Sequence, residues 1–131
     1  MISKSKKILM VAGEVSGDLW GSLLAKALLQ IDPDLKIFGA GLDKMRQAGI
    51  SLLLPPEKLI QLSVVGTLEN IGKVPALFRL RRLILNSVQQ ERPRLVILID
   101  FPGFNLNLAK KLQRFNVPLV YYSPPQTWLW G

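Results

Sequence analysis

The sequence contains no cysteine and no histidine. Without cysteine, a disulfide framework and a thiol nucleophile are both excluded. Without histidine, the commonest general base and the commonest metal ligand are missing. Acid–base chemistry must therefore fall to Asp, Glu, Lys or Tyr, and we expect neither a metal nor a cofactor.

Long apolar runs are missing as well. No run approaches the roughly 20 residues that span a bilayer. The first residues, MISKSKKILMVAGE, imitate a signal peptide, but the apolar stretch covers only residues 8–12 before Glu14 interrupts it. This stretch is too short for a signal-peptide core, so we predict a cytoplasmic protein.

Acidic residues are few: nine Asp and Glu face 17 Lys and Arg, which gives a formal net charge of +8. Such an excess indicates an anionic partner, or else a basic but inert surface. No aromatic-plus-basic RNA motif and no DNA-reading helix is recognisable, which disfavours nucleic acid. The 131 residues, 49% of them hydrophobic, predict one domain with a proper core.

The stretch 7–30 has the pattern of a buried strand, a turn and an amphipathic helix. The turn, GEVSGD at 13–18, is neither a G-x-G-x-x-G fingerprint nor a phosphate-binding P-loop. Its two carboxylates would repel a pyrophosphate. It suits an uncharged, hydroxyl-rich ligand such as a sugar. The alternative is that Ser16 caps the helix and Asp18 complements the positive helix end.

Further elements follow in alternation. The pattern predicts strands over 36–41, 51–54, 94–100 and 118–122, and helices over 42–48, 67–92 (interrupted at Pro75) and 104–115, with an irregular stretch over 57–66. This order predicts an α/β fold with a doubly wound, mostly parallel, Rossmann-like sheet.

The helix predicted over 76–90 has more apolar surface than one sheet contact requires. At about 100° per residue its apolar side chains cover roughly 220°, whereas one packed face needs little over 100°. Arg81 falls inside the apolar arc. A membrane-touching surface and a helix packed between two protein surfaces both fit this pattern.

Two features near the carboxyl end of the sequence favour a site. Asp100 follows the apolar strand LVILI directly, at the edge where ligands of α/β sheets bind. A half-desolvated carboxylate there has a raised pKa and suits a general base; its alternative role is to cap the next helix. Trp128 and Trp130 come after the last predicted strand, which predicts an exposed partner surface and a further domain beyond it.

Five motifs together resemble the amino-terminal half of bacterial lipid-A-disaccharide synthases. They occur in that family's order, over nearly the whole chain: VAGEVSGD at 11–18, FGAG at 38–41 with Met45, LSVVG at 62–66 with Glu69, IDFPGFN at 99–105, and YSP at 122–124 with WLW at 128–130.

The resemblance implies one Rossmann-like half of a glycosyltransferase-B architecture, with the donor-binding carboxyl-terminal domain absent from the chain. The implied reaction joins a UDP-linked diacylglucosamine to a phosphorylated diacylglucosamine, with inversion and loss of UDP, on the cytoplasmic face of the inner membrane. The implied partners are the glycolipid acceptor, the anionic membrane surface and a separate UDP-sugar-binding domain.

The resemblance also implies roles for individual residues. Asp100 becomes the base or charge stabiliser. The acceptor-binding positions are Gly13, Glu14, Ser16, Gly17, Asp18, Asn105 and Ser123, and the membrane-contact positions are Leu68, Ile71, Val74, Leu77, Phe78 and Arg81.

The sequence departs from the family pattern at several points. Gly103 replaces an acidic residue, Leu42-Asp43 replaces Gly-Pro, and the segment after Pro124 has one extra residue and no terminal Arg. Three hypotheses follow: the acceptor half of the glycosyltransferase, a non-catalytic glycolipid-binding or partner-binding module at the membrane, and a flavodoxin-like nucleotide binder. The acidic first turn argues against the third.

Overall fold

The computed structural model describes residues 5–59 and 74–123. Its elements are β1 (Lys7–Ala12), α1 (Val15–Ile31), β2 (Lys36–Ala40), α2 (Asp43–Gln47), β3 (Ser51–Leu52), α4 (Val74–Glu91), β4 (Leu95–Ile99), α5 (Pro102–Leu112), the 3-10 helix η2 (Gln113–Phe115) and β5 (Leu119–Tyr122). Residues 56–59 add a helical turn.

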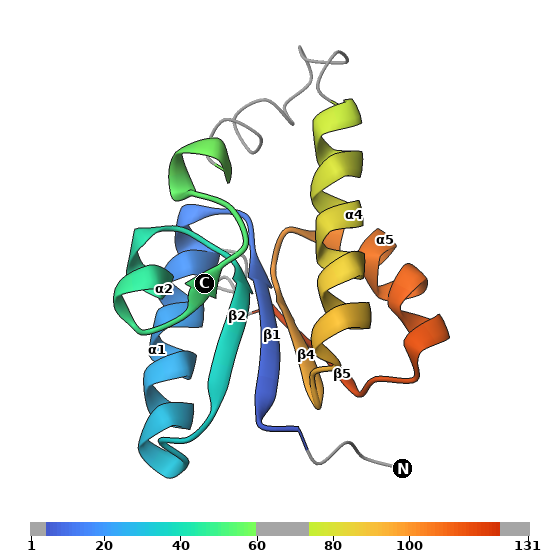
Figure 1. Ribbon diagram of the computed structural model, residues 1–131. Helices are drawn as coiled ribbons and strands as arrows, with labels where there is room; N and C mark the ends of the chain where they lie inside the picture. The colour runs from blue at the N-terminus through green and yellow to red at the C-terminus, as the bar shows by residue number, and fades with distance from the viewer. Residues whose placement is uncertain (1–4, 60–73, 124–131) are drawn as a thin grey trace, which may run out of the picture.

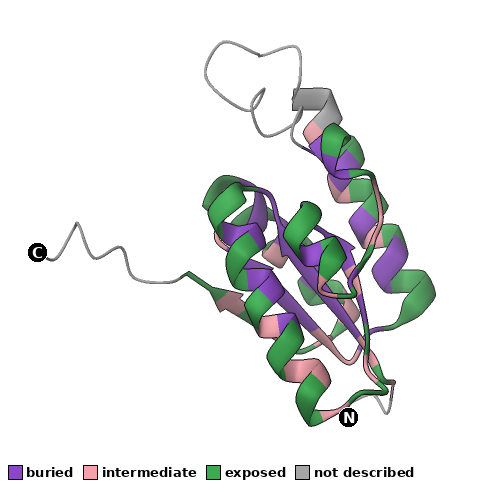
Figure 2. Ribbon diagram, turned by 90° about the vertical axis from the view of Figure 1, so that its left-hand side faces the viewer, coloured by how far each residue is buried: buried purple, intermediate pink, exposed green. Residues whose placement is uncertain are grey.

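The five strands form one parallel sheet in the order β3-β2-β1-β4-β5. α1 and α2 cover one face, and α4 and α5 cover the other (Figure 1). β1 and β4 are buried on both sides (Figure 2), because their alternate side chains enter two separate cores. The Rossmann-like α/β fold is therefore confirmed.

The core between the sheet and α4 explains how that helix is oriented. Leu80, Ile84 and Val88 are buried against it, at a spacing of four residues. Phe78 and Leu83, from the same apolar arc, are 48% and 39% exposed. The excess apolar surface expected from the sequence is thus real in the described part of the helix.

Element boundaries differ from the prediction mainly at helix starts. α1 begins at Val15, inside the predicted turn, and α5 begins at Pro102 rather than at Phe104. Pro suits the first turn of a helix because its missing N–H has no helical partner there. Pro75 stands in the first turn of α4, and residues 67–73 of the predicted helical region lie outside the described residues. Trp128 and Trp130 lie outside the described residues.

Candidate functional site

The candidate site lies where the chain changes direction across the sheet. From β1 the chain proceeds to β2 and β3 on one side, and from β4 it proceeds to β5 on the other. Glu14 follows β1 and Asp100 follows β4, and these two strands are neighbours. Ligands of open α/β sheets bind beyond the carboxyl ends of the strands at this switch point. Two of the residues singled out from the sequence therefore follow the carboxyl ends of neighbouring strands at this switch point.

The turn after β1 is shaped by close packing. A Cβ on Gly13 would lie 2.4 Å from the Phe101 ring, so only glycine fits beneath that ring. A Cβ on Gly17 would lie 3.3 Å from the Ala12 Cβ. Because glycine has no Cβ, α1 can approach the strand closely at this position. The N-cap of α1 is Glu14, whose exposed side chain makes no capping hydrogen bond. Ser16 is exposed inside the first turn, and its predicted role as the cap is wrong, since the helix starts before it.

Asp18 is 3% exposed and joins this turn to the second one. One of its carboxylate oxygens accepts hydrogen bonds from the backbone N–H groups of Leu42 (2.8 Å) and Met45 (3.0 Å), and the other accepts one from Lys44 (3.0 Å). These donors are the otherwise unpaired N–H groups at the start of α2. Asp18 thus caps α2 from another helix, and it is also the acidic residue in the first turn of its own helix, as the alternative interpretation expected.

Asp100 occupies a strained turn. Its φ is +47°, and that of Phe101 is +53°, so two consecutive non-glycine residues are left-handed. Each such residue costs on the order of 1–3 kcal/mol and persists only where its surroundings hold it. The Phe101 ring stacks on Phe104 with centroids 5.2 Å apart, and the Asp100 N–H donates to the Tyr122 carbonyl at 2.9 Å.

Asn105 is fully buried behind this turn. Its Nδ2 donates to the carbonyl oxygens of Asp100 at 2.8 Å and Ile99 at 3.2 Å, and lies 3.5 Å from that of Val11. The side chain therefore reaches the ends of both β1 and β4. It faces backbone rather than solvent.

The carboxylate of Asp100 is half-buried and accepts a hydrogen bond from the exposed Ser123 hydroxyl at 2.9 Å. Tyr121, on β5, was not singled out from the sequence. Burial, followed by the negative charges of Asp100 and Glu14, raises the pKa of its phenol. Its hydroxyl therefore lies within electrostatic reach of both carboxylates. The apolar pattern of the predicted strand gave no indication that the Tyr121 phenol lies near these carboxylates.

The structure divides the predicted acceptor-binding residues into two groups. Glu14, Ser16 and Ser123 are exposed, and Asp100 is half-exposed, so these side chains are open to a ligand. The remaining residues are buried and set the backbone geometry: Gly13, Gly17, Asp18 and Asn105.

The predicted membrane-contact residues lie only partly in the described chain. Leu68 and Ile71 lie outside it, and Val74 begins α4. Leu77 is half-buried and Phe78 is exposed. The guanidinium carbon of Arg81 lies 4.6 Å from the centroid of the Phe78 ring, and the guanidinium also donates to the Asn107 side-chain oxygen on α5.

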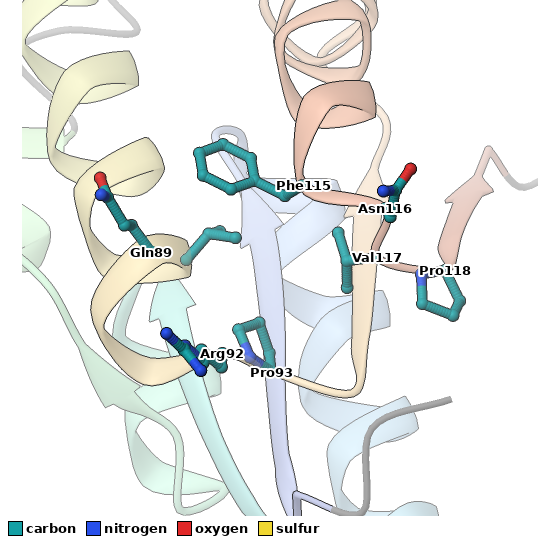
Figure 3. A pocket seen from close by; sticks show the side chains of 8 residues that line it. Gln89, Arg92, Pro93, Phe115, Asn116, Val117 and Pro118 are labelled. Atoms are coloured by element: carbon teal, nitrogen blue, oxygen red, sulfur yellow. The ribbon is translucent and has the colours of Figure 1, made fainter. Parts of the chain in front are cut away.

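Two hollows lie near β5. One of about 570 Å³ is lined by Val88, Gln89, Arg92, Pro93, Phe115, Asn116, Val117 and Pro118 (Figure 3). Pro93 and Pro118 precede β4 and β5, so this hollow lies at the amino ends of the strands, whereas Asp100 lies at their carboxyl ends. The other, of about 500 Å³, is apolar and is lined by Trp20, Leu23, Leu24, Ile97, Val120 and Tyr122. Tyr122 connects it to the candidate site.

Within residues 5–59 and 74–123 no group of three or more acidic residues is arranged to hold a metal ion. No helix of the described chain is both long and apolar enough to cross a membrane.

The fold defines a Rossmann-like domain, and the polar strand ends form a candidate site at its switch point. Comparison with known proteins identifies the family: the one described as lipid-A-disaccharide synthetase matches residues 8–131. The chain therefore belongs to the lipid-A-disaccharide synthase family.

Individual relatives are similar over nearly the whole chain. The lipid-A-disaccharide synthase of Solibacter usitatus is 41% identical over 124 residues, which cover 95% of this chain and 32% of the relative. That of Geobacter sulfurreducens is 40% identical over 126 residues, covering 96% and 32%. That of Coxiella burnetii strain Dugway is 37% identical over 126 residues, covering 96% and 33%. The chain spans about a third of the length of these curated relatives.

Proposed function

We propose that this chain forms the acceptor side of a lipid-A-disaccharide synthase-type glycosyltransferase of the glycosyltransferase-B architecture. The observation that carries the proposal is the position of Asp100 at the switch point, where it is hydrogen-bonded to Ser123 and follows the strand next to the one that precedes Glu14. The acceptor is a phosphorylated, acylated glucosamine. Its hydroxyl groups contact the open side chains of Glu14, Ser16 and Ser123.

In the proposed reaction, the Asp100 carboxylate takes the proton of the attacking acceptor hydroxyl. The hydroxyl oxygen bonds to the anomeric carbon of the UDP-linked sugar from the face opposite the diphosphate. The bond between that carbon and the diphosphate oxygen breaks, and UDP leaves with the electron pair. The configuration inverts, and no covalent intermediate with the protein is formed.

Asp100→Asn tests the chemical step in the chain combined with a UDP-sugar-binding domain of the family. A positioned general base contributes typically 10²–10⁴-fold, so kcat for UDP release should fall by about that factor while acceptor affinity changes little. Asp43→Asn is the matched control, because Asp43 is exposed on α2 and forms a surface ion pair with Arg46. An Asp100 variant with full activity would refute the assigned role.

The membrane surface is a second part of the proposal. The helices α4, α5 and η2 carry six cations, and Glu91 is the single acidic residue in them; the cations are Arg79, Arg81, Arg82, Lys110, Lys111 and Arg114. Phe78, Leu83 and Leu106 add exposed apolar side chains. We therefore place peripheral contact with an anionic bilayer on this face, where each cation near such a surface contributes about 1 kcal/mol, weakened by salt.

Sedimentation with anionic liposomes at low and high salt tests the surface. Binding should be strong at low salt and should fall when Leu77 and Phe78 are both changed to Ser. Val120→Ser is the matched control, because Val120 is 47% exposed on β5, in the hollow beside α1. Unchanged binding of a folded Leu77/Phe78 variant would show that α4 is not the anchor.

The non-catalytic module is the alternative function. It shares the acceptor site and the membrane surface but not the reaction. An NMR titration with a short-chain phosphorylated glucosamine should shift the amide signals of Glu14, Asp100 and Ser123 under both functions. UDP release that is lost in Asp100→Asn would support the enzyme, because the non-catalytic module has no reaction to lose. A nucleotide that shifts these signals in place of the sugar would favour the flavodoxin-like hypothesis.

A further inference from the structure

Consecutive left-handed residues are difficult to keep in place at a strand end. Asp100 (φ +47°) and Phe101 (φ +53°) have Cβ atoms that disfavour this conformation. Phe101 also precedes Pro102, and the ring of a proline restricts the residue before it to extended backbone. An isolated peptide of this sequence would therefore relax out of the turn. Something in the fold must hold it.

Asn105 supplies the groups that hold the turn. It lies near the start of α5, and its backbone N–H donates to the Phe101 carbonyl at 2.8 Å, which closes the turn. Its side-chain N–H groups donate to the Asp100 carbonyl at 2.8 Å and to the Ile99 carbonyl at 3.2 Å. The two peptide groups that flank Asp100 therefore both have their carbonyl oxygens fixed by one side chain.

The chemistry of the position requires an amide. The carbonyl oxygens facing the Asn105 side chain accept hydrogen bonds and offer no proton. Leucine would leave them unpaired, and aspartate would place a negative charge against them. The Asn105 Oδ1 is buried and has no partner among the described residues. The hydrogen bonds of Asn105 are therefore made by its side-chain N–H groups, while its oxygen makes none among the described residues.

The held turn sets the direction of the Asp100 side chain. The Asp100 N–H donates to the Tyr122 carbonyl, while its carboxylate accepts the Ser123 hydroxyl proton. Backbone and side chain are thereby aligned along the end of β5. We propose that Asn105 is a positioning residue, which holds the left-handed Asp100–Phe101 turn so that the Asp100 carboxylate stays at the end of β5, within hydrogen-bond distance of Ser123. Its importance for catalysis depends on the proposed function, but its effect on the turn does not.

NMR of Asn105→Ala in the chain as it stands tests the conformational claim. A positive φ gives a strong intraresidue amide–Hα NOE, and we expect this signal to weaken at Asp100 while the Ser123 signals shift. Asn107→Ala is the matched control, since Asn107 is the same residue type, two positions further along α5, and exposed. A folded Asn105→Ala variant that keeps the strong NOE at Asp100 would overturn the proposal.

If Asn105→Ala does not fold, a second pair of variants decides. Glycine adopts positive φ without strain, so adding Phe101→Gly should restore folding. Adding Phe101→Ala removes the same ring without relieving the strain, and folding should stay lost. Failure of glycine to restore folding beyond alanine would equally overturn the proposal.

Activity gives a separate readout in the chain combined with its UDP-sugar-binding domain. Asn105→Ala should lower kcat by about 100-fold, the size of effect expected for a displacement of about 1 Å, and KM for the acceptor should change little. An altered turn with unchanged kcat would count against the proposed role of Asp100 but leave the conformational claim intact. An unaltered turn, at any activity, would overturn the claim about Asn105.

Discussion

Replacing Asp18 should reveal how much of the fold depends on one buried carboxylate. Asp18→Ala leaves three backbone N–H groups at the start of α2 without a partner, and those of Leu42 and Met45 are buried. Each unsatisfied buried donor costs about 1–3 kcal/mol, and partial access of water to the Lys44 N–H lowers the sum. We expect a loss of about 3–5 kcal/mol in the free energy of unfolding. Asp18→Asn keeps a single acceptor oxygen and should cost about 2–3 kcal/mol.

Urea denaturation followed by circular dichroism measures this loss. With a slope of about 1.5 kcal/mol per molar urea, 3 kcal/mol lowers the midpoint by about 2 M. Asp43→Asn, which breaks a surface pair on the same helix, should cost no more than about 0.5 kcal/mol. If Asp18→Asn lowers the free energy of unfolding by less than about 1 kcal/mol, the three hydrogen bonds do not stabilise the start of α2, and its packing on α1 holds it instead.

Three further outcomes are expected. Gly13→Ala forces a Cβ against the Phe101 ring and should cost about 1–3 kcal/mol, whereas Gly103→Ala, with no atom within 4 Å of its Cβ position, should be neutral or stabilising by urea denaturation. Equal losses for both would contradict the packing argument. Gly103→Asp restores the acidic residue of the family motif in the first turn of α5 and should stabilise by about 0.3–1 kcal/mol through the helix dipole, an effect that disappears in high salt if the reasoning is right. The Tyr121 phenol should titrate above 10.0; its stabilising contribution is present below that pH and is lost as pH rises through the folded-state pKa. A carbon-13 NMR titration should show that Asp100→Asn lowers the pKa of Tyr121 only in part, because burial is the larger cause. An unchanged pKa would show that the Asp100 charge does not act on the Tyr121 phenol.

The parallel sheet was predictable because its signals are local. Apolar runs such as LVILI, each followed by a turn, encode strands buried on both faces, and the order of the elements then fixes the fold class. The starts of α1 and α5 were predicted too late because neither begins with a side-chain cap. Propensity and glycine content suggested turns at positions where tertiary packing extends the helices.

The roles of the polar residues depend on contacts that no local pattern contains. The sequence predicted that Asp18, Asp100 and Asn105 matter, but whether a carboxylate or an amide faces a ligand or the backbone is decided by residues far away in the chain. Asp18 reaches Leu42, 24 positions later, and Asn105 lies at the end of β1, 94 positions from Val11. The left-handed turn at Asp100 has no signal in composition or periodicity.

The strand ends also indicate where the donor diphosphate binds. The residues that follow β1, β4 and β5 are Gly-Glu, Asp-Phe-Pro and Ser, with no lysine or arginine among them. Glu14 and Asp100 make this edge negative, and a carboxylate within 4 Å of a phosphate is repelled by about 1 kcal/mol even in bulk water, and by more where water is excluded. An acceptor hydroxyl is neutral and is favoured at the same place.

We therefore expect the UDP-sugar to be held by groups outside residues 1–131, and the isolated chain to release no UDP when both substrates are supplied. Positioning of two substrates is worth up to about 7–11 kcal/mol, so adding a UDP-sugar-binding domain in trans should raise the rate from background by several orders of magnitude. Robust turnover by the isolated chain would show that this edge binds both substrates, and the electrostatic argument would fail.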